Sequence, residues 1–151
     1  MPNAGAGAEA MPESGFACPR HPDLAVVDLP GKGRGVIATT FIPAGTLLEM
    51  VPVVPLTWQD EVTLKATPLD PYVFKWRANG ESKSSQENPD AVICAIVLGI
   101  TSLVNHSLRP NADIEYDFAR RTLSLISIKD IPCNEEVAYD YDCELWFEAK
   151  E

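Results

Sequence analysis

The stretch SLVNHSLRPN, residues 102–111, constrains the fold of this chain more strongly than any other segment. From Asn105 onward it follows a long apolar run, and it places Asn105, His106, Ser107, Pro110 and Asn111 close together. A buried strand normally excludes such side chains unless they are hydrogen-bonded. We therefore expect a buried irregular segment in which Ser107 and Asn111 bind backbone groups and Pro110 fixes the exit of the chain.

The apolar run before it, AVICAIVLGITSLV (91–104), is a core segment by its composition. Its pattern leaves strand and helix both open, and Gly99 predicts a break within it. The run is too short to cross a bilayer, which takes about 20 apolar residues. We expect a soluble protein that does not bind membranes.

Composition and charge indicate one acidic globular domain. The chain has 151 residues, 46% of them hydrophobic, which is enough for a single core. Its net charge of −10 has the wrong sign for direct nucleic-acid binding and suits a basic protein or peptide partner. Acidic residues gather in 135–151, either as a solvated face or as a surface that attracts a basic substrate. The oligomeric state stays open, a homodimer included.

Short strands with proline and glycine between them predict a mainly β fold. The prolines in TLLEMVPVVPL (46–56) are typical of a strand at a sheet edge. A short helix is expected over 57–66, because Thr57 can cap it and Asp60 stands three residues further on. The other expected elements are strands at 24–29, 35–42, 72–76, 112–118, 121–128 and 135–141, and a polar loop at 79–90.

The cysteine pattern gives no sign of a metal site. The chain has four cysteines, Cys18, Cys94, Cys133 and Cys143. None forms a C-x-x-C pair, so we expect free thiols in a reducing compartment. Cys18 and His21 have ligand-like spacing, but Pro19 lies between them and no second pair follows, so no metal is expected.

Three motifs follow one another along the chain: GKGRGV (31–36), SLVNHSLRPNA (102–112) and EEVAYDY (135–141). Together they resemble the SET-domain family of protein-lysine methyltransferases. The resemblance implies a β-clip-like SET fold of short strands in several small sheets, with few short helices and a knot-like arrangement of the last two motifs. The first 14 residues have almost no large apolar side chains, so we expect a flexible arm at 1–15, followed by one free-standing SET domain at 16–151. Only Cys143 follows the third motif, so the chain departs from family members that carry a cysteine-rich zinc-binding tail.

The same resemblance implies transfer of methyl groups from S-adenosylmethionine (SAM) to the ε-amine of a protein lysine. The cofactor site would comprise Lys32, Gly33, Arg34, Asn105, His106, Tyr141 and Trp146. The lysine channel would be lined by Tyr72, Trp76, Tyr139 and Phe147. Tyr141 and Tyr139 would be the catalytic residues. Tyr141 would orient the amine, and the Tyr139 phenol would hold a water that restricts the product to mono- or dimethyllysine.

Several alternatives remain open. The glycine turn by itself fits an ordinary hairpin, and the polar segment fits a knot without a cofactor. Tyr72 and Trp76 also fit core aromatics of a strand, and Trp146 and Phe147, in an expected helical turn at 143–150, also fit packing of the terminus. The alternative function is a catalytically weak SET module that grips basic peptides. The substrate is open between a histone tail and another basic protein, in the nucleus or the cytoplasm.

Overall fold

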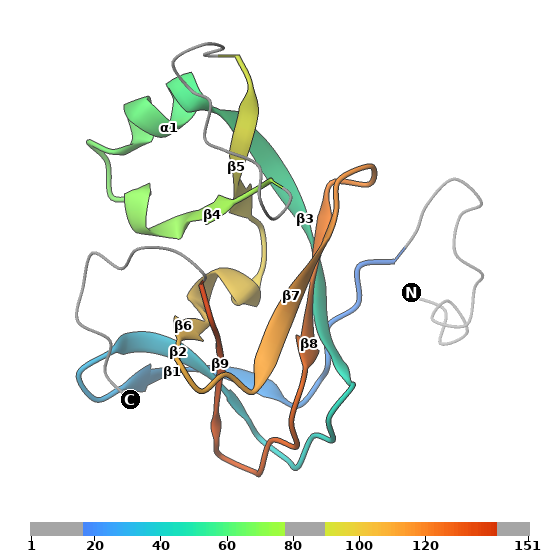
Figure 1. Cartoon of the computed structure of the whole chain (residues 1–151). Helices are drawn as coiled ribbons and strands as arrows, with labels where there is room; N and C mark the ends of the chain where they lie inside the picture. The colour runs from blue at the N-terminus through green and yellow to red at the C-terminus, as the bar shows by residue number, and fades with distance from the viewer. Residues whose placement is uncertain (1–16, 78–89, 142–151) are drawn as a thin grey trace, which may run out of the picture.

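The computed structural model of the chain describes residues 17–77 and 90–141 (Figure 1). The expected arm at 1–15 and the expected helical turn at 143–150, with Trp146 and Phe147, lie outside these ranges. The expected loop at 79–90 also lies outside them, except for Asp90. Among the described residues, no helix has the length and apolar character that crossing a membrane requires.

Strands dominate the described ranges, which contain one α-helix and two short 3-10 helices. In chain order the elements are β1 (Leu24–Leu29), β2 (Gly33–Ala38), β3 (Leu47–Thr57), α1 (Trp58–Leu64), the 3-10 helix Asp70–Tyr72, β4 (Val73–Lys75), β5 (Val92–Val97), the 3-10 helix Ile100–Leu103, β6 (Asn105–His106), β7 (Ala112–Asp117), β8 (Thr122–Ser127) and β9 (Glu136–Tyr139). The predicted mainly β fold with few short helices is confirmed.

The strands form two sheets. The four-stranded sheet has the order β1-β2-β9-β6, and the five-stranded sheet has the order β4-β5-β3-β8-β7. In Figure 1, α1, β4 and β5 lie at the opposite end of the molecule from β1 and β2. A core of fully buried apolar side chains is drawn from both sheets and their connections, and includes Val36, Ile42, Leu48, Val104, Leu125, Ile131 and Val137.

The proline-containing strand β3 is central in its sheet, so its predicted place at an edge is wrong. Its two halves pair with different neighbours: 47–52 with β8 and 53–57 with β5. Each half therefore has one paired side and one unpaired side. A proline is tolerated where no ladder bond needs its missing amide donor, and this explains how Pro52 and Pro55 fit a central strand.

The other elements agree with the sequence to within a few residues. β2 begins at Gly33 rather than at residue 35, because Gly33 pairs with Leu29 directly after the turn. Helix α1 has the expected capping box. The Asp60 amide donates to the Thr57 hydroxyl at 3.2 Å, and the Asp60 carboxylate accepts from the Thr57 amide at 2.9 Å. The apolar run forms β5 and the second 3-10 helix, with the expected break at Gly99.

β6 and β9 bring the second and third motifs side by side, as the resemblance implies. The two strands pair in parallel, with Asn105 opposite Ala138 and His106 opposite Tyr139. Parallel pairing requires a long connection between the two strands, and the β7–β8 hairpin supplies it. The pairing therefore places the polar segment against the strand that carries the tyrosines.

The buried polar residues of this segment bind backbone groups, which confirms their expected role. Ser107 and Asn111 are each 7% exposed. The Asn111 Oδ1 accepts from the Ala138 amide at 2.9 Å, and its Nδ2 donates to the Glu136 carbonyl at 2.8 Å. The Ser107 hydroxyl accepts from the Arg109 amide at 2.9 Å. Asn111 thus fastens the polar segment to β9.

Candidate active site

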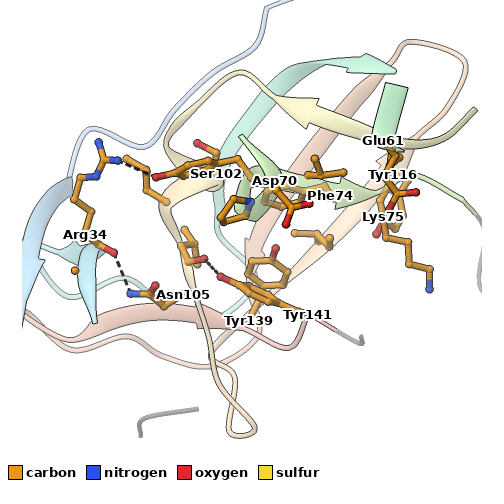
Figure 2. Close-up of a pocket in the computed structure, with 18 of the residues that line it drawn as sticks. Arg34, Glu61, Asp70, Phe74, Lys75, Ser102, Asn105, Tyr116, Tyr139 and Tyr141 are labelled. Carbon is orange, nitrogen blue, oxygen red and sulfur yellow. Dashed lines mark hydrogen bonds between the residues drawn. The ribbon is translucent and has the colours of Figure 1, made fainter. Parts of the chain in front are cut away.

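A pocket of about 720 Å³ lies where the glycine turn, β4, β6, β7 and the end of β9 approach one another. Pockets of ~300–1,000 Å³ are typical of small-molecule sites. Figure 2 shows Arg34 and Asn105 at one end, Glu61, Lys75 and Tyr116 at the other, and Tyr139 and Tyr141 between them. The predicted site residues that line it are Lys32, Gly33, Arg34, Tyr72, Asn105, Tyr139 and Tyr141.

The glycine turn forms one end of the pocket and contacts Asn105. The Asn105 Nδ2 donates to the Arg34 carbonyl at 3.2 Å and to the Glu136 carboxylate at 2.8 Å (Figure 2). Gly35 allows this close approach, because a Cβ there would lie 2.9 Å from Asn105 Nδ2 and 2.3 Å from Leu29 Cδ1. Both hydrogen bonds use the Nδ2 of Asn105 as the donor. The Asn105 Oδ1 is an acceptor that has no hydrogen-bond partner within residues 17–77 and 90–141.

Two cationic side chains lie at the same end of the pocket. The Lys32 ammonium forms an ion pair with Glu136 at 2.9 Å, and both side chains are about one-fifth exposed. The Arg34 guanidinium donates to the Tyr72 hydroxyl at 2.9 Å. Contacts of this kind near solvent contribute little free energy, typically ~0–1 kcal/mol. An anionic ligand can therefore compete for both cations.

Tyr139 and Tyr141 form the middle of the pocket wall. Their ring centroids lie 4.8 Å apart. The Tyr141 hydroxyl donates to the Val104 carbonyl at 2.8 Å. Phe74 of β4 stacks on Tyr139, with the ring centroids 6.2 Å apart and the planes 20° from parallel. The result is a largely aromatic passage in which one phenol and one carbonyl hold each other in place.

His106 lies beside the pocket and is not part of its wall. Its side chain is 2% exposed, and its Nδ1 accepts a hydrogen bond from the Tyr141 amide at 3.1 Å. A neutral imidazole that accepts at Nδ1 carries its proton on Nε2. That Nε2 is buried and has no hydrogen-bond partner among the described residues. The ring holds the backbone of Tyr141. The predicted contact of His106 with the cofactor stays a prediction.

Trp76, predicted to line the channel, belongs to a hydrophobic core cluster and is not among the residues that line this pocket. It is 4% exposed. Its ring meets Tyr116 and Phe118 edge-on, at centroid distances of 5.5 Å and 5.0 Å. This agrees with the alternative of a core aromatic. Tyr72, the other aromatic residue for which both roles were open, does line the pocket.

The sequence did not reveal several residues of the wall. These are Glu61, Asp70, Phe74, Ser102, Ile114 and Tyr116. Ile114 and Tyr116 stand two apart on β7, and this spacing indicates that they share one face of the strand. The spacing does not say what that face contacts. Glu61 and Asp70 carried no signal beyond being charged residues in and after a short helix.

The described part of the chain shows no convergence of metal ligands. Within 17–77 and 90–141, no three His, Cys, Asp or Glu side chains lie close enough together to hold an ion. Cys18, Cys94 and Cys133 are free thiols in this part. The absence of zinc from the whole protein remains a prediction.

The chain matches a known family in sequence. The family model of the SET domain matches residues 33–142. The Schizosaccharomyces pombe histone-lysine N-methyltransferase specific for H3 lysine-37 is 32% identical over 126 residues, which cover 83% of this chain and 77% of that protein. The chain belongs to the SET-domain family of protein-lysine methyltransferases.

Solved structures share the fold. The Neurospora SET domain protein DIM-5, a histone lysine methyltransferase, is 22% identical with a TM-score of 0.57, over 84% of this chain and 55% of that chain. Arabidopsis thaliana SUVH6, solved in complex with SAM, is 19% identical with a TM-score of 0.59, over 82% of this chain and 29% of that chain. The predicted SET fold is confirmed, and the chain is a SAM-dependent protein-lysine methyltransferase.

The residues at the glycine-turn end of the pocket fit SAM. Gly33 has a φ of +77°, which favours glycine, and no atom lies within 4 Å of the place a Cβ would take. Ligand atoms can therefore approach the backbone there. Lys32 and Arg34 provide positive charge for a carboxylate, and the Asn105 Oδ1 provides an acceptor for an ammonium group. This donor and acceptor set matches the amino-acid end of the cofactor.

Proposed function

We propose that this enzyme methylates a lysine in a histone tail, and that histone H3 is the substrate. The observation that carries the proposal is one pocket that joins the glycine turn to Tyr139 and Tyr141. The 32% identical relative is named as specific for H3 lysine-37, and a net charge of −10 suits a basic tail. The enzyme would then act in the nucleus, as a single domain over 16–151.

We assign cofactor binding to the glycine-turn end of the pocket. Bound SAM supplies an electrophilic methyl group on a sulfonium. Lys32 and Arg34 would bind its carboxylate, the Asn105 Oδ1 would accept from its ammonium, and the open backbone at Gly33 would allow close contact. His106 would contribute indirectly, because its ring binds the amide of Tyr141.

The other half of the pocket would receive the substrate lysine as a neutral amine. A free lysine has a pKa of about 10.4, so its deprotonation at neutral pH costs roughly 4–5 kcal/mol. Apolar walls lower this cost by penalising the ammonium form. Phe74, Ile114 and Tyr139 would form these walls, and Tyr72 would line the channel beside them. Trp146 and Phe147 are proposed to cover the channel.

Tyr141 would orient the amine for in-line transfer. Its hydroxyl and the Val104 carbonyl are held together at 2.8 Å, so both stand at a fixed place in the wall. Catalysis of this kind depends mainly on placing the reacting atoms, since no proton needs to be removed once the amine is neutral. The carbonyl can also attract polarised C–H groups weakly.

The first test is methyl transfer to histones. Purified enzyme with tritiated SAM is expected to label H3 among the core histones, because the net charge of −10 on the enzyme favours a basic tail. H3 carrying arginine in place of lysine-37 is the matched control, since arginine keeps the charge and cannot accept the methyl group in this site. The same reaction is run with a cell extract. If other proteins in the extract are labelled and H3 is not, the proposal that H3 is the substrate is wrong, while the assignment as a protein-lysine methyltransferase stands.

The second test concerns the number of methyl groups added. We propose that the Tyr139 phenol holds a water that occupies the space of a further methyl group, so the wild-type product is mono- or dimethyllysine. Tyr139→Phe should retain methyl transfer and should yield higher methylation states. Mass spectrometry of a methylated H3 peptide measures both. An unchanged product distribution would show that Tyr139 does not limit the methylation state.

A further inference from the structure

Glu49 is a buried carboxylate that lies outside the pocket. It stands on β3, is 4% exposed, and does not line the pocket wall. Burying a charged group is unfavourable unless hydrogen bonds or an opposite charge compensate for it. No Lys or Arg among residues 17–77 and 90–141 forms an ion pair with it. The compensation therefore comes from hydrogen-bond donors.

Three donors converge on this carboxylate, all from the start of the 3-10 helix Ile100–Leu103. The Oε1 accepts from the Thr101 amide at 2.9 Å and from the Thr101 hydroxyl at 2.7 Å. The Oε2 accepts from the Ile100 amide at 3.3 Å. Thr101 is fully buried. The carboxylate therefore fixes the first turn of the helix to β3.

Gly99 shows how closely this helix is held against β3. A Cβ at Gly99 would lie 2.6 Å from the Glu49 Oε1 and 2.3 Å from the Val51 Cγ1. Any larger residue would require the helix, the Glu49 carboxylate or the Val51 side chain to move. The φ of Gly99 is −166°, an extended value open to any residue, so close approach and not backbone conformation explains the glycine.

The same short helix leads directly into the pocket. The Val104 amide donates to the Thr101 carbonyl at 3.2 Å. The Val104 carbonyl then accepts from the Tyr141 hydroxyl at 2.8 Å, and Asn105 follows in the chain. Val104 is 1% exposed. The position of Val104 is therefore fixed by two contacts. Its amide bonds the helical turn that Glu49 holds, and its carbonyl bonds the Tyr141 hydroxyl.

We propose that Glu49 is a positioning residue for methyl transfer: its carboxylate fixes the 3-10 helix so that the Val104 carbonyl meets the Tyr141 hydroxyl. The proposal rests on the role of Tyr141 proposed above. An ionised carboxylate offers acceptors only, which matches three converging donors. A glutamine would keep the size of the side chain but would turn an NH₂ group toward at least one of these donors.

The test is a double-mutant cycle of Glu49→Gln with Tyr141→Phe. Glu49→Gln alone is expected to lower kcat about 10-fold, since small displacements in an oriented site reduce the rate strongly. The KM for the peptide and the Kd for SAM should stay within about twofold, because the lost interaction acts mainly in the transition state. In the Tyr141→Phe background the further loss should shrink to about twofold, because coupled residues are not additive. Single-turnover kinetics measure both backgrounds.

Ser127→Ala is the matched control. Ser127 is 1% exposed and its hydroxyl bonds the Pro43 carbonyl and the Thr46 amide, away from the pocket wall. The Ser127→Ala substitution should lower the melting temperature. It should change the rate of methyl transfer by the same factor in the wild-type and the Tyr141→Phe backgrounds. Thr101→Val, which removes only the hydroxyl donor, repeats the cycle if Glu49→Gln does not fold.

Two different outcomes overturn different statements. Equal fold losses for Glu49→Gln with and without the Tyr141 hydroxyl would make Glu49 a purely structural residue and overturn this inference alone. Full activity of Tyr141→Phe by itself would overturn the proposed role of Tyr141, whatever the result at Glu49.

Discussion

Replacement of Tyr141 by phenylalanine is expected to lower kcat for methyl transfer about 100-fold, because a misplacement on the order of 1 Å in an oriented site costs that much. The lost hydroxyl is the one that donates to the Val104 carbonyl at 2.8 Å. The aromatic ring stays, so the shape of the pocket and the Kd for SAM should change little. Single-turnover transfer from tritiated SAM and calorimetric titration of SAM measure the two quantities.

Asn105→Ala is the control, because it is expected to weaken SAM binding and to change kcat less. Its side chain bonds the Arg34 carbonyl and Glu136 at the cofactor end of the pocket. Its loss should weaken SAM binding by about 1 kcal/mol or more and should affect kcat at saturating SAM less. Full kcat in Tyr141→Phe would mean that Tyr141 does not orient the amine. Equal changes of Kd in both variants would mean that the pocket is not divided into a cofactor end and a transfer end.

Asn111→Ala is expected to lower the free energy of unfolding by about 2–4 kcal/mol, because each buried polar group left without a partner costs ~1–3 kcal/mol. Alanine would leave two such groups, the Ala138 amide and the Glu136 carbonyl, at the place where the polar segment meets β9. For a domain of this size the loss corresponds to a decrease in melting temperature of roughly 5–15 °C. Urea and thermal denaturation measure it.

Asp113→Ala is the control for this loss of stability. Asp113 is exposed on β7, and within the described ranges its carboxylate accepts only from the neighbouring Ile114 amide. Its replacement should change stability by no more than about 0.5 kcal/mol, as is usual for surface positions. If Asn111→Ala were as mild as Asp113→Ala, Asn111 would not be the group that fastens the polar segment to β9.

Elements that depend on local chemistry were predictable from the sequence. The capping box of α1 lies within four residues, and the β7–β8 hairpin joins strands that are neighbours in the chain. The place of β3 was not predictable in the same way. Pro52 correctly indicates a side without ladder bonds, but only tertiary structure shows that the strand changes partner at that point.

The residues of the candidate site also differ in how well the sequence predicted them. Asn105, Tyr139 and Tyr141 were identified because they belong to motifs, and all three line the pocket. Trp76 and His106 were assigned to the site on their residue type and their motif, and neither lines the pocket. Which face of a strand meets a ligand is decided by packing between sheets, and a single sequence does not encode that in any short pattern.

The parallel pairing of β6 with β9 also has a consequence for the order in which the protein acquires activity during folding. The bond between the Tyr141 hydroxyl and the Val104 carbonyl joins positions 37 apart in the chain. The β7–β8 hairpin between them closes through near neighbours, with Asp117 opposite Thr122. Short closures have the lower entropic cost and precede distant ones. A refolding molecule is therefore expected to regain most of its β structure while it is still unable to transfer a methyl group.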